Sequence, residues 1–547
     1  MKQVLIINIT RMGDLVQMGA LLDRLQEEWP GVAVDLIVDR RFAPVVSLLS
    51  GLREVITVDF HELIDDSRAA VKDVITLFRD AVSWVKPLAE RGYDRVINLT
   101  FNKPSALLAG LIGAPDIRGA QSAWDGGTVV ENPWMAYFCD FHQFRRLNRF
   151  NLVDIYALGG SRPGTFAPLR LSCSPEDYAW ARETLTGAAE WIAVQAGASD
   201  GMKAWRPHLF GLALANLSRR WPGGIVFIGG REEEATIAEV IQVYREAGGK
   251  NPVKNMAGRT TLNQLAGLLA ECRLLLTNDT GPMHIGVAVG TSVVDLSVGH
   301  VDFQETGPYG PGHWVIQPEL DCAPCGFEQV CAHHACKDRI SPDFVADLMC
   351  HVLGAGPCPT RVAGGRLYES GVDEDGLGTF RLKGGIESPV TEWYAAFWRR
   401  YWYETHTGLR SHLSPPEGLP PDASEVKGQL RTLMPLLEAA CRRAEKIVQL
   451  AGGASVDISE LKRLQREQKA DQERLLRIGM ATEVLAPLAA AFGRQVQSDN
   501  VLGLDRLAKH QSGAYQTWLR RVREIDRCLT PDHARNLIMV GPERQAA

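Results

Sequence analysis

The sequence lacks three features that mark large classes of protein. No stretch approaches the roughly 18–20 consecutive apolar residues of a membrane-spanning helix. The start, MKQVLIINIT, is too short an apolar run for a signal peptide. An excess of positive charge is missing too, because the net charge is −6 and the pI is about 6.2. We therefore expect a cytoplasmic protein and no nucleic-acid partner.

Cysteine is also scarce for a disulfide-stabilised protein, at eleven residues in 547. The reducing cytoplasm makes disulfides unfavourable in any case. Hydrophobic residues make up 45% of the chain and charged residues 23%, which is ordinary for a globular protein. Domains usually contain roughly 100–200 residues, so the length indicates about three of them.

Short β-branched runs alternate with helical patterns through the first part of the chain. The clearest predicted strands are residues 4–9, 32–38, 55–58 and 95–99. Such alternation is typical of a parallel, doubly wound sheet. A Gly/Pro-rich break at residues 159–164 then resembles an interdomain linker. We predict a Rossmann-like domain over residues 1–160.

A second alternating series predicts another α/β domain over residues 165–358. Its strands are expected at residues 191–194, 225–228, 274–277 and 293–298. Two such domains joined by a linker would face each other across a cleft at the carboxyl ends of their strands. Open parallel sheets bind their ligands at such edges.

The pattern changes after Cys358. Residues 359–423 read as a linker with turns or a small hairpin at 364–385, followed by a helix crowded with aromatic residues at 393–403. These aromatics could stack on a sugar, but rings along one helix more often form a core or a domain interface. Residues 424–547 have helical periodicity and predict a bundle of three or four helices. This region is a candidate for docking a protein acceptor or forming an oligomer.

The segment at residues 278–284 (NDTGPMH) carries the most informative local chemistry. It lies between an apolar run and a helical pattern, so it reads as a buried strand opening into a helix. The first N–H groups of such a helix carry the positive end of its dipole and can bind a phosphate. Asp279, Thr280, Gly281 and His284 are the candidate ligand-binding residues of this turn.

Three further residues follow predicted strands. Asp14 comes after Gly13 at the start of a helix, where it could act in the cleft or merely cap the helix. Lys203 ends a loop of small residues and could neutralise a diphosphate, although surface loops often contain Gly and Lys. Glu232 begins another helix and could accept hydrogen bonds from a ribose, or simply be an acidic helix N-terminus.

Together these segments resemble glycosyltransferase family 9, the ADP-heptose heptosyltransferases of lipopolysaccharide synthesis and their relatives. The similar motifs are NITRMGDL at residues 8–15, the GAS…K-x-W segment at 197–205, NMAGRTTLNQLAGLL at 255–269, TNDTGPMHIGVAVGTSVV at 277–294 and TGPYGP at 306–311. The resemblance covers about residues 1–355, and the helical C-terminal region lies outside it.

The resemblance implies a GT-B fold and an inverting enzyme without a catalytic metal. The first domain would bind the acceptor, mainly, and the second the nucleotide-sugar donor. Carried over by position, Asp14 would be the general base and Lys203 the diphosphate contact. Asp279, Thr280, Gly281 and His284 would bind the donor, and a glutamate among residues 232–234, with Glu232 as the leading candidate, would meet its ribose.

We therefore expect transfer of a sugar, with heptose from ADP-heptose as the leading donor, to a lipopolysaccharide core glycolipid or a glycoprotein. The loops around Asn102, Trp124 and Arg145 are expected to face this acceptor. Two alternatives stay open: a GT-B transferase that uses another nucleotide sugar, and a catalytically silent sugar-nucleotide-binding or scaffold protein. Asp14, Lys203 and His284 argue against the silent protein, because a decayed enzyme would be expected to lose some of them.

Four cysteines within fifteen residues form the most distinctive local pattern. Cys322, Cys325, Cys331 and Cys336 have the composition of a tetrahedral site for zinc or iron. The alternatives are ordinary buried cysteines or incidental disulfides. A site closed by four thiolates leaves no coordination position for a substrate, so we expect any metal there to be structural.

Overall fold

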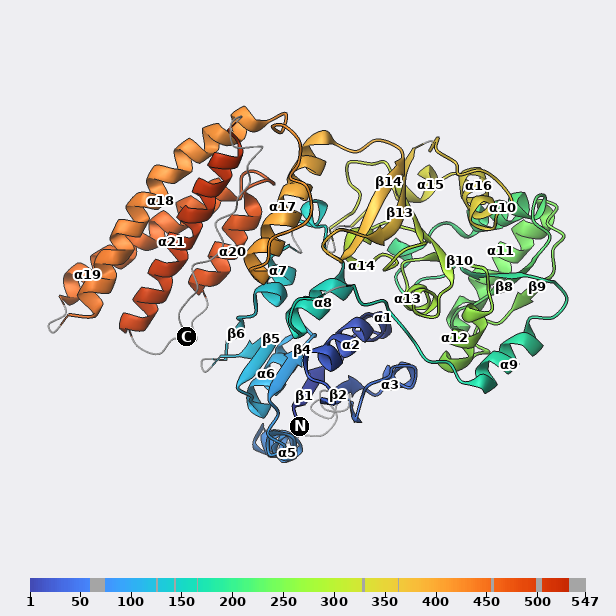
Figure 1. Cartoon of the computed structure of the whole chain (residues 1–547), viewed down its shortest axis with the longest axis horizontal. Coiled ribbons are helices and arrows are strands. Elements are labelled where there is room, and N and C mark those ends of the chain that lie inside the picture. The colour runs from blue at the N-terminus through green and yellow to red at the C-terminus, as the bar shows by residue number, and fades with distance from the viewer. Residues whose placement is uncertain are drawn as a thin grey trace. The chain divides into compact units, whose positions relative to one another are not determined.

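The computed structural model describes residues 1–59, 74–123, 126–141, 144–164, 166–326, 330–362, 364–453, 457–497 and 504–530 (Figure 1). These residues form two compact units. The first contains Met1–Thr100, Ile112–Ile117 and Arg149–Glu387, and the second contains Phe101–Leu111, Arg118–Asn148 and Ser388–Ala547. Trp124 lies outside the described residues. None of the described helices combines the length and the apolar composition needed to span a bilayer.

The first sheet has the strand order β3-β2-β1-β4-β5-β6. Strands β1 to β4 run parallel, as the pairings of β1 with β2 and β4 and of β2 with β3 show, and they confirm the four strands predicted there. The antiparallel pair β5–β6 was not predicted, because β5 is polar and β6 has only three residues. The bounds are β1 (Gln3–Ile7), β2 (Ala33–Asp39), β3 (Glu54–Val58), β4 (Arg95–Asn98), β5 (Asp116–Ser122) and β6 (Thr128–Val130).

Helices alternate with these strands, as a doubly wound sheet requires. The predicted linker at residues 159–164 begins inside the last of them, since Gly159 and Gly160 are buried in α8. The helices are α1 (Met12–Gln17), α2 (Gly19–Glu28), α3 (Ala43–Val46), α5 (Val74–Ala89), α6 (Lys103–Ile112), α7 (Pro133–Phe141), the 3-10 turn η1 (Arg145–Leu147) and α8 (Leu152–Gly160).

The second sheet has eight strands in the order β14-β13-β12-β11-β10-β7-β8-β9. Strands β7 to β12 pair in parallel, and β7, β8, β10 and β11 confirm the predicted strands. The predicted hairpin is present as β13–β14, but it continues this sheet through antiparallel pairing with β12. The bounds are β7 (Trp191–Gln195), β8 (Gly224–Phe227), β9 (Val253–Asn255), β10 (Leu274–Asn278), β11 (Ser292–Leu296), β12 (Trp314–Pro318), β13 (Gly365–Val372) and β14 (Gly378–Gly384).

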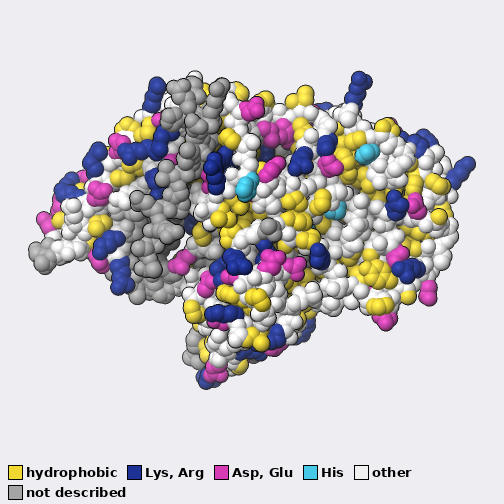
Figure 2. Space-filling model, viewed as in Figure 1, with side chains coloured by type: hydrophobic (Ala, Val, Ile, Leu, Met, Phe, Trp, Pro, Cys, Tyr) yellow, Lys and Arg dark blue, Asp and Glu magenta, His cyan; other side chains and the backbone are white. Residues whose placement is uncertain are grey.

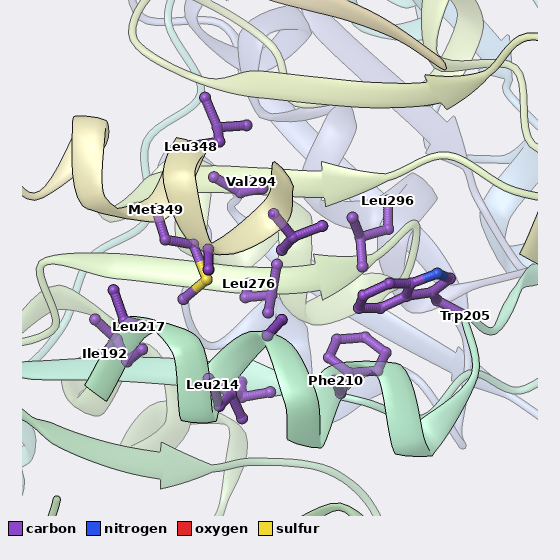
Figure 3. Close-up of a cluster of buried hydrophobic side chains, with 14 of the residues drawn as sticks. Ile192, Trp205, Phe210, Leu214, Leu217, Leu276, Val294, Leu296, Leu348 and Met349 are labelled. Atoms are coloured by element: carbon purple, nitrogen blue, oxygen red, sulfur yellow. The ribbon is translucent and has the colours of Figure 1, made fainter. Parts of the chain in front are cut away.

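Alternate side chains of this sheet face its two sides. On one side, Leu276, Val294 and Leu296 pack with Phe210 of α10 and Met349 of α16 in a fully buried apolar core (Figure 3). The predicted class of two Rossmann-like domains with a C-terminal mainly helical part is thereby confirmed. The helices of this half are α9 (Pro175–Thr184), η2 (Gly201–Lys203), α10 (Pro207–Ser218), η3 (Arg231–Glu233), α11 (Glu234–Glu246), α12 (Leu262–Ala270), α13 (Gly281–Ala288), α14 (Phe303–Thr306), α15 (Cys336–Arg339) and α16 (Pro342–Val352).

The second unit contains the aromatic helix α17 (Pro389–Thr407) and a bundle of four described helices: α18 (Ala423–Ala451), α19 (Ile458–Gly479), α20 (Ala486–Gln497) and α21 (Leu504–Cys528). The bundle confirms the predicted three or four helices. The rings of Trp398 and Trp402 stack with centroids 5.6 Å apart, and both are at least 98% buried. The aromatic segment is therefore core, as expected, and does not offer its faces to a sugar.

The charged side chains on the molecular face in Figure 2 are mixed in sign. Lys and Arg lie between Asp and Glu over the described part of that face. The mixture agrees with the small net charge of −6. The described part of this face therefore has no excess of one charge that would attract a large ion over a long distance.

An ion pair inside the second unit joins parts of the chain far apart in sequence. Arg494 of α20 donates from Nε and Nη2 to the two carboxylate oxygens of Asp140 in α7, both at 2.9 Å. Asp140 is largely buried, and burial raises the pKa of its carboxyl group against the effect of Arg494. A bidentate pair of this kind fixes orientation as well as charge.

We expect Arg494→Ala to lower the free energy of unfolding by about 2–3 kcal/mol, because it leaves the carboxylate of Asp140 buried without its partner. Urea unfolding of the full chain measures this. Arg463→Ala is the matched control, since Arg463 pairs with Glu460 and Glu467 at the surface and its loss should matter much less. Equal effects of the two substitutions would contradict the assignment.

Candidate functional site

The first turn of the site follows β1. Asp14 lies in the first turn of α1, whose N-cap Arg11 makes no side-chain capping bond. The Thr10 hydroxyl donates to Asp14 Oδ2 at 2.9 Å, and Asn8 Nδ2 donates to the Asp14 backbone carbonyl at 3.1 Å. The carboxyl group is therefore held by a neighbouring hydroxyl, and the helix-capping alternative finds no capping hydrogen bond in its support.

The surroundings of Asp14 make its carboxylate a better base. Burial raises the pKa of this group, with a smaller raising effect from Asp279. The Thr10 hydrogen bond and the charges of Arg11 and Lys203 act in the opposite direction without cancelling the rise. A carboxylate with a raised pKa accepts a proton more readily, which is what a general base at neutral pH needs.

The second turn connects β10 to α13. Asp279 is buried, and its Oδ2 accepts a hydrogen bond of 2.6 Å from the Thr306 hydroxyl. Thr280 is the N-cap of α13 and makes no side-chain capping bond. Pro282 has no N–H, and the Met283 N–H already donates to the Thr280 carbonyl at 3.0 Å. This helix end consequently offers fewer N–H groups to a phosphate than the sequence pattern predicts.

His284 faces the first turn from α13. Its side chain is buried, and burial lowers the pKa of the imidazole to about 4. The ring is therefore neutral at neutral pH. Nδ1 has no hydrogen-bond partner among the described residues. A neutral imidazole can donate or accept a hydrogen bond without adding charge.

Two glycines allow these turns to touch. A Cβ on Gly13 would lie 3.0 Å from His284 Cδ2, and a Cβ on Gly281 would lie 2.1 Å from the Met12 methyl carbon. Helices α1 and α13 accordingly pack against each other within the first unit. The structure therefore brings Asp14 next to the turn that carries Asp279, Thr280, Gly281 and His284.

The loop that carries Lys203 is tied to the same turn. Asn278 Oδ1 accepts from the Trp205 N–H at 2.9 Å, while Asn278 Nδ2 donates to the carbonyls of Ala196 and Gly197, both at 3.1 Å. The Trp205 ring is fully buried and packs edge-to-face on Phe210 with centroids 5.0 Å apart (Figure 3). Asn278 was not singled out from the sequence, although it stands within the 278–284 segment.

The cysteine segment, residues 322–338, also contacts the loop that carries Lys203. Lys337 Nζ donates to the Gly201 carbonyl, and Arg206 pairs with Asp338. The Cys325 N–H donates to the Gly299 carbonyl at 3.0 Å. Gly299 itself approaches the loop so closely that a Cβ would lie 2.2 Å from the Met202 carbonyl oxygen. The residues around the cysteines therefore position Lys203.

The predicted metal site is not supported. The four cysteines of this segment are free thiols: Cys322, Cys325, Cys331 and Cys336. Burial is the main reason why the pKa of Cys325 is raised, and the other three thiols raise it further. In the described residues, however, no set of three or more His, Cys, Asp or Glu could hold a metal ion. Cys336 packs into the apolar core, and the Cys331 sulfur accepts the His334 N–H at 3.3 Å.

The acidic residue held at the end of β8 is Glu233, whereas the predicted Glu232 is exposed. Gln195 Nε2 donates to both carboxylate oxygens of Glu233 at 2.9 Å, and the Gly230 N–H donates to Oε2 at 2.7 Å. Both glutamates lie in the 3-10 turn η3, and the rotation of this turn directs Glu233 inward. This rotation cannot be read from the sequence. Glu233 thus replaces Glu232 as the candidate for binding a ribose.

Comparison with known proteins finds a family that matches part of the chain. Residues 81–335 match the family described as Glycosyltransferase family 9 (heptosyltransferase). This stretch includes Lys203, Asp279 and His284 and ends at the cysteine segment. Asp14 lies before it, so its role depends on the geometry of the two turns.

The curated relatives are bacterial heptosyltransferases. A lipooligosaccharide heptosyltransferase 2 of Campylobacter jejuni is 30% identical over 160 residues, which are 28% of this chain and 49% of the relative. The chain thus spans about half the length of this relative. The lipopolysaccharide core heptosyltransferase OpsX of Haemophilus influenzae is 23% identical over 317 residues, 56% of this chain and 82% of the relative. Among solved structures, the ADP-heptose lipopolysaccharide heptosyltransferase II of E. coli is 20% identical, with 65% of this chain and 99% of that chain covered and a TM-score of 0.48.

We expect Gly13→Ala to disturb the contact between the two turns, because its methyl group would meet the His284 ring at 3.0 Å, closer than a normal carbon contact. Overpacking of this kind costs about 1 kcal/mol or more of unfolding free energy, measured by urea unfolding. Gly201→Ala is the control, because a Cβ there meets no atom within 4 Å. If both variants have the unfolding free energy of the wild type, the two turns do not touch.

Proposed function

We propose that the chain, whose residues 81–335 match glycosyltransferase family 9, transfers a sugar from a nucleotide donor to a bacterial surface glycan with inversion at the anomeric carbon. The observation that carries this proposal is the contact of Gly13 with His284. It sets a carboxylate with a raised pKa beside a turn suited to a phosphorylated ligand.

In the proposed reaction, Asp14 takes the proton of the acceptor hydroxyl. The acceptor oxygen forms a bond to the anomeric carbon while the bond from that carbon to the diphosphate oxygen breaks. Attack from the face opposite the leaving group inverts the configuration. General-base assistance of this kind is typically worth ~10²–10⁴-fold in rate. No step calls for a catalytic metal.

The departing diphosphate needs positive charge, and we assign that role to Lys203. The charge of Lys203 already acts on Asp14 and His284, so it lies within electrostatic reach of both. The N-terminus of α13 contributes less, because Pro282 and Met283 leave few free N–H groups there. Asp279, Thr280, Gly281 and a neutral His284 would orient the donor phosphates and sugar.

We assign the ribose to Glu233. Its carboxylate lies at the strand end, close to Gly197, where a Cβ would come 1.8 Å from Oε1. The side-chain amide of Gln195 donates hydrogen bonds to both oxygens of this carboxylate. The hydrogen bonds from Gln195 and Gly230 use three of the roughly four lone-pair sites of a carboxylate, so one site on Oε1 is left for a ribose hydroxyl group.

The donor we propose is ADP-heptose and the acceptor a lipopolysaccharide core, by analogy with the relatives. Other nucleotide sugars are the alternative donors, and a glycoprotein is the alternative acceptor. A protein acceptor is favoured by one observation: the C-terminal helices share a compact unit with Phe101–Leu111 and Arg118–Asn148. These segments include Asn102 and Arg145, whose loops are expected to face the acceptor. Lipopolysaccharide core synthesis would place the enzyme at the cytoplasmic face of the inner membrane.

We expect Asp14→Asn to lower transfer by ~10²–10⁴-fold while binding of ADP is kept, because only proton removal is lost. Release of ADP from ADP-heptose, with heptose-deficient lipopolysaccharide as acceptor, measures transfer. Parallel reactions with UDP-, GDP- and CDP-sugars identify a different donor if there is one.

The matched control is Asp23→Asn, which removes a carboxyl group from α2 outside the site and should keep wild-type transfer. Wild-type turnover by Asp14→Asn would remove Asp14 as the base. A wild-type chain that binds ADP but transfers no sugar from any of these donors would favour the silent binding protein.

We expect Glu233→Gln to weaken ADP binding by about tenfold, because a hydrogen bond to a charged group is worth roughly 1.5–3 kcal/mol. Calorimetric titration with ADP measures this. Glu232→Gln removes the neighbouring, exposed carboxylate and should leave the affinity unchanged. Weaker ADP binding by Glu232→Gln together with unchanged binding by Glu233→Gln would show that Glu232 binds the ribose instead.

A further inference from the structure

Three polar residues form a row across the strands beneath the donor site. Thr277 of β10 is in register with Gln195 of β7 on one side and with Asp295 of β11 on the other. All three are buried. Side chains in register on adjacent parallel strands point to the same side of the sheet. This is the side opposite the apolar core of Figure 3, to which Leu276, Val294 and Leu296 belong.

Two members of the row support residues that we assign to the donor. Gln195 donates to both carboxylate oxygens of Glu233. The Thr277 hydroxyl donates to the Asn278 carbonyl at 2.7 Å and lies 3.4 Å from the Thr280 hydroxyl. The row therefore serves as a polar support on which the donor-binding turns rest.

Asp295, the third member, has no such contact. Its side chain is fully buried, and neither carboxyl oxygen has a hydrogen-bond partner of good geometry among the described residues. A buried polar group without a partner costs about 1–3 kcal/mol, so an apolar residue at this strand position would be more favourable for folding alone. The charged groups that act on Asp295 are Asp279 and Lys203.

We propose that Asp295 is a positioning residue of the donor site, whose carboxyl group controls diphosphate binding from within the sheet through Asp279 and Lys203. This inference rests on the proposed function, because it requires Lys203 to face a diphosphate. It assigns Asp295 no contact with the reacting atoms.

The effect follows from the charge of the carboxyl group. Burial is the main reason why the pKa of Asp295 is raised well above its usual value, and the charge of Asp279 raises it further. Lys203 and the Leu296 N–H oppose the rise less strongly. The in-register neighbours Thr277 and Val315 carry no charge. The raised pKa favours the neutral form of Asp295, and a neutral carboxyl group leaves the Lys203 ammonium available to the phosphates.

Loss of this proton would place a second negative charge beside Asp279. That charge would attract the ammonium of Lys203 and repel the diphosphate. If the donor binds only when Asp295 is protonated, the affinity falls by up to tenfold for each pH unit above the pKa of Asp295. A rise in pH therefore weakens donor binding, whereas the removal of this carboxyl group eliminates that part of the pH dependence.

The test is the pH dependence of ADP and inorganic pyrophosphate affinity, measured by calorimetric titration from neutral to alkaline pH on the full chain. For the wild type we expect affinity to fall by up to tenfold per pH unit at the alkaline end. Asp295→Asn should match the wild type within about twofold at neutral pH, because asparagine has the shape and charge of the protonated carboxyl group that the proposal requires, and should lose this fall. Its unfolding midpoint should be equal to or higher than that of the wild type.

Ser297→Ala is the matched control, because it removes a buried polar group just after the end of β11, two residues from Asp295, without removing a charge, and it should keep the wild-type profile. If Asp295→Asn does not fold, Asp295→Val, which suits a buried strand, should show the same flat profile. Identical profiles for the wild type and the folded Asp295 variant would overturn this inference alone. A wild type that binds neither ADP nor pyrophosphate would overturn the donor site itself, and this inference with it.

Discussion

The contact between Gly13 and His284 is the constraint on which the rest of the site depends. Each residue stands just after a parallel strand, where the chain turns into a helix, and only a residue without a side chain lets the two turns approach so closely. The contact brings the carboxylate of Asp14 to the turn between β10 and α13. It also explains why His284 is buried and neutral, since α1 covers the ring on the side that would otherwise meet water. The contact between Gly13 and His284 thus determines both how the two turns pack and how His284 is charged.

Burial and neighbouring charges act together on the acidic groups of this site. The pKa values of Asp14 and Asp295 are raised mainly by burial, whereas Asp279 accepts a hydrogen bond from Thr306 and acts on both as a negative charge. Lys203 acts in the opposite direction on the same two groups. A ligand with two phosphates adds negative charge to this balance, so the protonation of the acids and the binding of the ligand are linked. The loop that carries Lys203 must then be firmly placed, and Asn278, Trp205 and the segment after Cys336 provide this.

Much of the site could be predicted from the sequence, because parallel strands gather their carboxyl ends at one edge. That rule, with the family motifs, sufficed to select Asp14, Lys203, Asp279 and His284 as residues of one region. What the sequence could not decide depended on rotation about a helix or on contacts distant in sequence. The choice between Glu232 and Glu233 depends on one 3-10 turn, and Cys336 packs into a core built from residues of other elements. Asp295 was overlooked because its neighbours in the row, Gln195 and Thr277, come from other strands.

The C-terminal helices illustrate the same limit on a larger scale. Their sequence predicts a separate bundle, yet the unit that contains them also includes Phe101–Leu111 and Arg118–Asn148. Asp140 of α7 is paired by Arg494, and Trp134 of α7 meets the buried ring of His406 in α17 with centroids 5.2 Å apart. A chain without these helices would leave a buried carboxylate unpaired and aromatic rings exposed on α7. The helices are therefore part of the fold of this segment, and any acceptor bound by residues 101–148 is bound by a surface that the C-terminal region stabilises.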